Sequence, residues 1–165
     1  DRSGTSARRY TWLTAPLNPN VAGAFITLRK VSGAANARIR AIYVTNTNVA
    51  AGTGPITFWS RATIGSGGTT VAATAIGKKN IADANAALEI KTGSIVVTNE
   101  VSMMFGGGMN VTTASTAGIQ TAWKALDFYD VILLGNEEGL SFKMLAAPAS
   151  DADNRIAVGI EWEEE

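Results

Sequence analysis

Apolar and polar residues alternate with a period of two along the last third of the chain. Apolar side chains occupy every second position within 140–145 and again from Ile156 to Trp162. That period is expected of strands that bury one face. The connections GNEEG at 135–139 and APASDAD at 147–153 are rich in residues that reverse a chain. The pattern predicts a C-terminal antiparallel meander whose apolar face is covered by a second sheet.

The earlier part of the chain shows the same strand signals between polar, glycine-rich loops. Its apolar segments are rich in β-branched and aromatic residues, which favour strands. Strict alternation in the second segment would place Ile39, Ala41 and Tyr43 on one face, and the glycines at 65–68 are expected to end the third. The predicted strands cover residues 24–30, 37–46, 56–64, 69–76, 89–98 and 101–105, and 109–121 is predicted to be a strand or an exposed loop.

One segment has a helical pattern. Asn80 is suited to cap a helix, and Ile81 and Leu88 share one face with two alanines. The pattern predicts a two-turn connector helix over 80–88 that must dock on the sheets, because so short a helix is marginal alone. A further helical turn is expected within AWKALDFYD at 122–130.

The strand pattern also predicts the fold class. Eight or nine short strands with one small helix favour an all-β, antiparallel two-sheet sandwich with jelly-roll-like wiring. An immunoglobulin-like sandwich is the alternative, although its usual cysteine pair is missing. We predict an extended N-terminal arm, residues 1–20, followed by a single β-sandwich domain, residues 21–165.

The composition excludes several kinds of chemistry. The 165-residue chain contains no cysteine and no histidine. Disulfides and thiolate metal sites are therefore excluded, and Ser/His hydrolases and zinc enzymes are disfavoured. We predict neither a cofactor nor a metal. No apolar run approaches the ~20 residues of a membrane helix, and a start at Asp1 instead of Met leaves a removed signal peptide open.

The charges are distributed unevenly. Residues 1–80 contain ten bases and one acid, a net charge of +9, whereas residues 81–165 contain four bases and thirteen acids, a net charge of −9. One interpretation is intramolecular or scattered surface charge. The other is a basic arm that meets an acidic surface on a neighbouring subunit or another protein. Nucleic acid is disfavoured because the acidic half would repel phosphate.

The N-terminal segment has large apolar side chains but no periodic face to bury them. Aromatic residues and arginine are enriched among interface anchors, so the arm is predicted to bind a partner. The alternative is that it covers the open edge of its own sheet. The predicted partner-binding residues are Arg8, Arg9, Tyr10, Trp12 and Leu13.

Other candidate motifs are better interpreted as structural. The glycines at 65–68 lack the helix and the Lys-Ser/Thr pair of a phosphate loop. Asp151 and Asp153 resemble the start of a calcium loop, but Arg155 stands at the next ligand position, which favours a solvated turn. The glutamates of EWEEE at 161–165 are interpreted as a charged sheet edge that discourages aggregation.

Four stretches carry a resemblance to a family. GNEEGLSFKM, IAVGIEWEEE, RIRAIYVTNT and GGTTVAATAI are similar to segments of small β-sandwich virion proteins of tailed bacteriophages, over about half of the chain. Such proteins include jelly-roll capsid decoration, or cement, proteins, which commonly sit as trimers on the shell. The resemblance implies a location on the virion capsid surface, with the major capsid protein and further copies of this chain as partners.

The leading hypothesis is therefore a non-enzymatic structural protein that binds and stabilises a viral capsid shell, with a homotrimer expected and no nucleic-acid or membrane partner. A second hypothesis is a carbohydrate- or receptor-binding module, extracellular or on a tail fibre, that uses Trp59 and Trp123 to stack on sugars. A third is an extracellular filament subunit that donates its arm to the next copy. An enzyme acting through carboxylates, Lys or Tyr is the weakest hypothesis.

Overall fold

The computed structural model describes residues 7–14, 24–46, 57–105, 120–121, 131–133, 137–144 and 156–165. Within them the chain forms strands almost throughout, and the prediction of an all-β protein is confirmed. The elements are β1 (Arg8–Leu13), β2 (Ala24–Arg29), β3 (Ala37–Asn46), β4 (Thr57–Thr70), the 3₁₀ turn η1 (Ala73–Ala75), β5 (Gly77–Lys78), β6 (Glu89–Phe105), β7 (Gln120–Thr121), β8 (Val131–Leu133), β9 (Glu138–Met144) and β10 (Ile156–Glu164).

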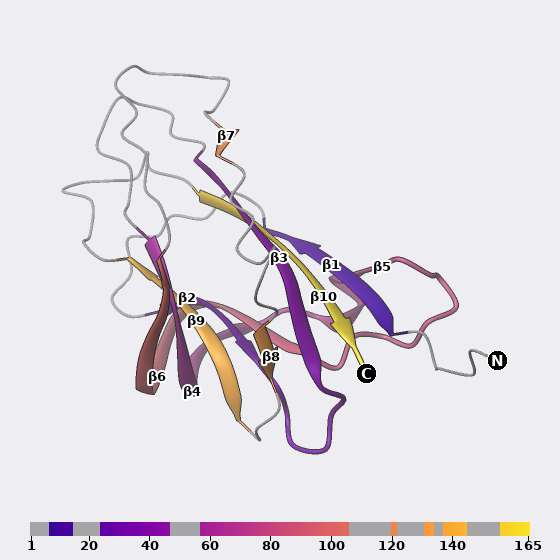
Figure 1. Ribbon diagram of the computed structural model, residues 1–165, viewed down its shortest axis with the longest axis horizontal. Helices are drawn as coiled ribbons and strands as arrows, with labels where there is room; N and C mark the ends of the chain where they lie inside the picture. Colours follow the sequence, from indigo (N-terminus) through magenta and orange to yellow (C-terminus); the bar gives the residue numbers. More distant parts are fainter. Residues whose placement is uncertain are drawn as a thin grey trace.

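The strands form two antiparallel sheets, as predicted (Figure 1). Sheet A has the order β5-β1-β10-β3-β7, and β8 also pairs with β3. Sheet B closes on itself in the order β2-β6-β4-β9 and is therefore a small barrel. The predicted two open sheets are thus one open sheet and one barrel.

The predicted C-terminal meander is wrong in its connectivity but correct in its faces. Strand β9 belongs to the barrel, whereas β8 and β10 belong to sheet A, so the chain crosses between the sheets instead of pairing consecutive strands. Leu140 and Phe142 of β9 and Val158, Ile160 and Trp162 of β10 are each at most 1% exposed and join one core cluster. Burying each such side chain stabilises the fold by roughly 1.5–3 kcal/mol, because apolar surface leaves water. The two strands therefore meet across the core.

The inside of the barrel is filled by small side chains and by isoleucines. Trp59 of β4 faces the shared core, so the alternation of the strand turns Ser60, Ala62 and Ile64 to the opposite face. The Oγ atoms of Ser60 and Ser141 lie 2.7 Å apart and are buried. At Gly139, any Cβ would lie 2.2 Å from the backbone oxygen of the adjacent strand β2, at Leu28. Strands β9 and β2 therefore approach each other too closely at Gly139 for any side chain there.

Strict alternation fails in β3 because of a β-bulge. Across β10, Ile42 is opposite Ile160 and Ile39 is opposite Trp162, which leaves one extra residue on β3 around Arg40. Ile39 and Ile42 therefore both reach the core, although three positions separate them. The prediction that Ile42 lies on the face opposite Ile39 is wrong for this reason.

The glycines at 65–68 do not end a strand. Strand β4 continues through them to Thr70, with positive φ at Gly67 and Gly68 and shifts of register against β6. A Cβ at Gly67 would lie 2.5 Å from the backbone oxygen of Ser94. Glycine allows the two long strands to bulge and stay paired. The predicted strands 89–98 and 101–105 are one strand, β6, whereas only Thr69 and Thr70 of the predicted strand 69–76 belong to β4.

The predicted helix over 80–88 is also wrong. Its residues form turns, and the 3₁₀ turn lies earlier, at Ala73–Ala75, inside a predicted strand. Asn80 uses its side-chain oxygen to accept a hydrogen bond from the N–H of Ala82, 3.1 Å away. Such a local bond offers the backbone an alternative to a helix. The described residues therefore contain a 3₁₀ turn at Ala73–Ala75 and no helix over 80–88.

Candidate functional site

The predicted partner-binding residues lie on β1, which is paired on both sides within its own sheet. Strand β1 pairs along its length with β10, and Tyr10 and Thr11 also pair with β5. Tyr10 and Trp12 point into the core, where they are 1% and 9% exposed. The Tyr10 ring stacks on that of Trp162 with 5.6 Å between centroids. Strand β1 is therefore an internal strand of sheet A that contributes two aromatic side chains to the core.

The remaining predicted residues stay accessible. Arg8, Arg9 and Leu13 are exposed, and Leu13 is 71% exposed. Because β1 alternates, Arg9 and Leu13 lie on the outer face of sheet A, opposite the core. Partner binding by these three side chains stays a prediction, whereas Tyr10 and Trp12 serve the core.

A charged ladder crosses the outer face of sheet A. The carboxylate of Glu163 lies 2.7 Å from Nε of Arg9 on β1 and 2.7 Å from a guanidinium nitrogen of Arg40 on β3. Burial would raise the pKa of Glu163, but the hydrogen bonds and charges of Arg40 and Arg9 outweigh burial and hold this pKa below its ordinary value. The ladder therefore joins three neighbouring strands of one sheet.

Glu164 points to the other side of β10 and fixes the loop that follows β5. Its carboxylate accepts hydrogen bonds at 3.0 Å from the N–H groups of Ala87 and Leu88 and from Nε1 of Trp162. Glu164 is only 3% exposed. These N–H donors replace the water that a buried carboxylate loses. Glu164 is thus a structural anchor.

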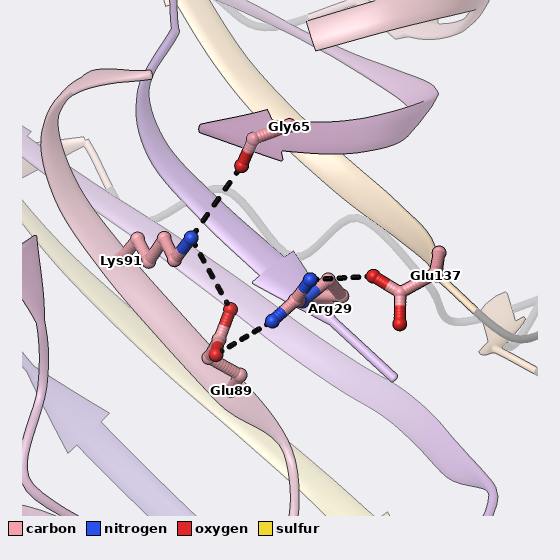
Figure 2. Close-up of polar contacts among 5 residues, drawn as sticks. All are labelled: Arg29, Gly65, Glu89, Lys91 and Glu137. Carbon is pink, nitrogen blue, oxygen red and sulfur yellow. Dashed lines mark hydrogen bonds and ion pairs between the residues drawn. The ribbon is translucent and has the colours of Figure 1, made fainter. Parts of the chain in front are cut away.

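A third polar cluster lies on the barrel (Figure 2). The guanidinium of Arg29 contacts Glu137 at 2.5 Å and Glu89 at 2.8 Å. Lys91 lies 3.7 Å from the second oxygen of Glu89 and donates a hydrogen bond to the carbonyl of Gly65 at 3.4 Å. The cluster connects β2, β4 and β6 to the turn before β9, so its charges hold the barrel together.

These contacts show how the opposite charges of the two halves are used. Five arginines from the first 80 residues are paired with glutamates from the remainder, as the intramolecular interpretation predicts. Binding of the arm to an acidic surface elsewhere stays untested. The pairs are Arg9–Glu163, Arg29–Glu89, Arg29–Glu137, Arg38–Glu165, Arg40–Glu163 and Arg61–Glu138.

The C-terminal glutamates are not a sheet edge. Strand β10 lies between β1 and β3, so both of its edges are paired. Glu163 and Glu165 form ion pairs with arginines, and Glu164 accepts hydrogen bonds from N–H groups. Among the glutamates of 156–165, only Glu161 is exposed and has no such contact. Period-two sequence reasoning could not reveal this, because the strand's neighbours come from distant parts of the chain.

The loop of residues 77–88, which we call the anchored loop, projects beyond β1 at the edge of sheet A (Figure 1). Tyr10 donates a hydrogen bond from its hydroxyl to the carbonyl of Ala84 at 3.0 Å, and Lys78 donates one to the carbonyl of Asp83 at 2.8 Å. Together with the Glu164 bonds, these contacts fix both arms of the loop. At its tip Ile81 is 90% exposed.

Sequence reasoning missed Ile81 as a surface residue, because the helical pattern assigned it to a docked face. The signal in the sequence is Asn80, because asparagine favours a turn as much as a helix cap, and a turn at this point would expose Ile81. Among the described residues the exposed large apolar side chains are Leu13, Ile81, Val96 and Val101.

Other sequence candidates find no support as sites. Trp59 is fully buried and stacks on Phe142 with 4.4 Å between ring centroids, so it cannot present a face to a sugar. Trp123, Asp151 and Asp153 lie outside the described residues. Within the described ranges, no group of three or more acidic side chains is placed to hold a metal ion. The part of the chain that is described has no helix long and apolar enough to cross a membrane.

Comparisons with protein-family models, with curated proteins and with solved structures find no match to this chain. The candidate site is therefore defined by its own geometry: the anchored loop and the outer face of sheet A.

Proposed function

We propose that this chain is a structural, non-enzymatic protein that binds and stabilises a larger protein shell, as the resemblance to capsid decoration proteins implies. The major capsid protein of a virus particle is its proposed partner, the capsid surface its location, and jelly-roll-like wiring its proposed topology. The all-β architecture with two antiparallel sheets is compatible with this proposal.

The observation that carries the proposal is the use of the charged side chains. In the described residues, the charged clusters bind to one another or to backbone groups and connect strands: Glu163 joins β1, β10 and β3, and Arg29 joins β2 to β6. Catalysis by carboxylates requires acids that face a common substrate. These clusters instead connect neighbouring strands and stabilise the sheets. Such stabilisation suits a structural protein that binds to a larger assembly.

Of the other hypotheses, the carbohydrate-binding module loses one of its two residues, since Trp59 is buried and stacked on Phe142, while Trp123 lies outside the described residues. The filament hypothesis requires β1 to leave its own sheet, although Tyr10 and Trp12 of β1 are packed in the core of their own chain. Neither alternative is favoured by a specific contact.

The test is sedimentation of the protein with particles from its source material. We expect it to pellet with megadalton particles and to rebind after being stripped and added back. Repeating the experiment at ~1 M salt, where charge interactions are screened within about 3 Å, separates apolar from ionic contact. A protein that stays in the supernatant as a small free species at low salt contradicts the proposal.

A matched control is needed because deletion of residues 1–20 would remove β1 and its two core aromatics. The Val101→Asp variant alters an exposed residue of the barrel, 60% accessible, and is expected to keep the fold. The Val158→Asp variant, which places a charge in the core, should not rebind. Equal rebinding by the folded and the unfolded variant would show that pelleting is non-specific.

A further inference from the structure

Two surface features of the described residues do not take part in the internal charge pairs. The first is the anchored loop. Lys79 is exposed and is in none of the ion pairs among the described residues. Lys79 lies next to β1, because its N–H donates a hydrogen bond to the carbonyl of Arg9 at 3.0 Å. The loop therefore presents one protruding apolar side chain, Ile81, two residues after a lysine that has no acidic partner among the described residues.

The second feature lies on the outer face of sheet A. Gly159 of β10 stands opposite Leu13 of β1 on one side and Tyr43 of β3 on the other. A Cβ at Gly159 would touch the Leu13 and Tyr43 side chains at 3.6 Å, so these two side chains flank a position that has none. Glu161 follows on the same face, since cross-strand partners and alternate residues share a face.

The two features complement each other in shape and charge. The loop offers an isoleucine and a lysine. The face offers Leu13 and Tyr43 on either side of Gly159, with the carboxylate of Glu161, which is in no ion pair among the described residues, beside them. The loop cannot reach the outer face of its own sheet, because Tyr10 and Glu164 hold it on the core side. A second copy of the chain is free of that constraint.

We propose that the anchored loop of one copy docks on the outer face of sheet A of the next copy. Ile81 would lie over Gly159 between Leu13 and Tyr43, with Lys79 near Glu161. The loop is already fixed in each copy by the hydrogen bonds to Tyr10 and Glu164, so little conformational entropy is lost on docking. The contact is heterologous, since different surfaces meet, and it generates a ring or a chain of copies. This inference goes beyond the proposed function and is tested on the isolated protein.

The first experiment measures mass against concentration by sedimentation velocity. We expect the wild-type chain to self-associate and the Ile81→Asp variant to raise the dissociation constant by a factor of about 10 to 100, the worth of one buried aliphatic side chain. The Glu161→Lys variant should weaken association in the same way. Val101→Asp is the matched control, because Val101 is also exposed but lies on the barrel, and its association should be unchanged. Circular dichroism verifies that each variant is folded.

Mixing variants tests the pairing of the two surfaces. Ile81→Asp damages the loop and spares the face, whereas Leu13→Asp damages the face and spares the loop. An equimolar mixture should form a dimer, since one intact loop meets one intact face, and neither variant alone should associate. A wild-type chain that is monomeric up to about 1 mM overturns the proposal, as does a mixture that stays monomeric. Binding of the loop only to a different protein also overturns it.

Discussion

The inside of the barrel and the outer face of sheet A both depend on a glycine of a C-terminal strand, but for different reasons. In the barrel, a Cβ at Gly139 would lie 2.2 Å from the Leu28 carbonyl oxygen and 2.6 Å from Cγ1 of Ile64. On the sheet face, a Cβ at Gly159 would be in ordinary contact with Leu13 and Tyr43 at 3.6 Å. At Gly139 the barrel requires glycine, because two strands approach closely there. At Gly159 the outer face has enough space for a methyl group.

This difference indicates where the molecule tolerates change. A closed four-stranded barrel allows no side-chain growth inside, since its interior is already packed. The outer face is held by charges that remain partly solvated, such as Arg9, whose side chain is 56% exposed. We expect the barrel and the core to govern stability, and the outer face to govern binding.

The largest expected effect comes from a charge in the core that the two regions share. Val158→Asp should abolish folding, because Val158 is 0% exposed and an isolated carboxylate there loses its water without a partner. Loss of the near-ultraviolet circular dichroism signal would show it. Glu161→Lys, two residues further along the same strand but exposed, should remain folded. A folded Val158→Asp protein would contradict the assignment of the core.

The next effect separates the two glycines directly. Gly139→Ala should destabilise the protein by about 3 kcal/mol, because a backbone strand must move to admit the methyl group. Gly159→Ala should change the free energy of unfolding by less than about 1 kcal/mol, since its methyl group fits and restricts the unfolded chain. Urea denaturation of both variants measures the difference. Equal losses would mean that the barrel is not closed.

A smaller effect is expected from acid. The pKa of Glu163 is lowered in the folded protein despite its burial, by the hydrogen bonds and charges of Arg40 and Arg9, so the ionised form favours the folded state. Its contribution is present above the unfolded pKa and is lost as the pH falls through the lower folded pKa. Below about pH 4.5 the free energy of unfolding should fall. Glu163→Gln should flatten that fall, and a pH profile identical to wild type would contradict the ladder.

The smallest effect concerns the anchored loop. Tyr10→Phe removes the hydroxyl that donates to the carbonyl of Ala84 and should cost about 1 kcal/mol, while the stacking on Trp162 is kept. Amide hydrogen exchange should rise within residues 80–86 and stay unchanged in β9. Uniformly faster exchange in both segments would indicate a global effect instead of a local one.

The pattern of the sequence was sufficient for those strands whose alternation is regular. In β9 and β10 the period of two identified the buried face correctly, because burial on one face imposes that period wherever the strand pairs. It failed at Arg40, at Gly67 and at Asn80, where a bulge, a positive φ and a side-chain hydrogen bond replace regular geometry. Each of these depends on a partner that sequence spacing does not reveal.

The candidate site was predicted only in part. Arg8, Arg9 and Leu13 are on the surface as interface residues must be, but Tyr10 and Trp12 are core residues, since β10 and β5 enclose β1. Ile81 and Glu161 are candidates because the structure leaves Ile81 90% exposed and Glu161 exposed and outside the ion pairs of β10. Both observations need coordinates.

By itself, the sequence determined the class of the fold, because apolar alternation without long helical patterns leaves strands as the way to bury those side chains. It also determined the absence of histidine and cysteine chemistry. Only the tertiary structure decided which strands are neighbours, that one sheet closes into a barrel, and that the charges of the two halves are paired within one chain. The pairing of strands depends on contacts between residues that are far apart in the sequence, and a local pattern of residues does not reveal those contacts.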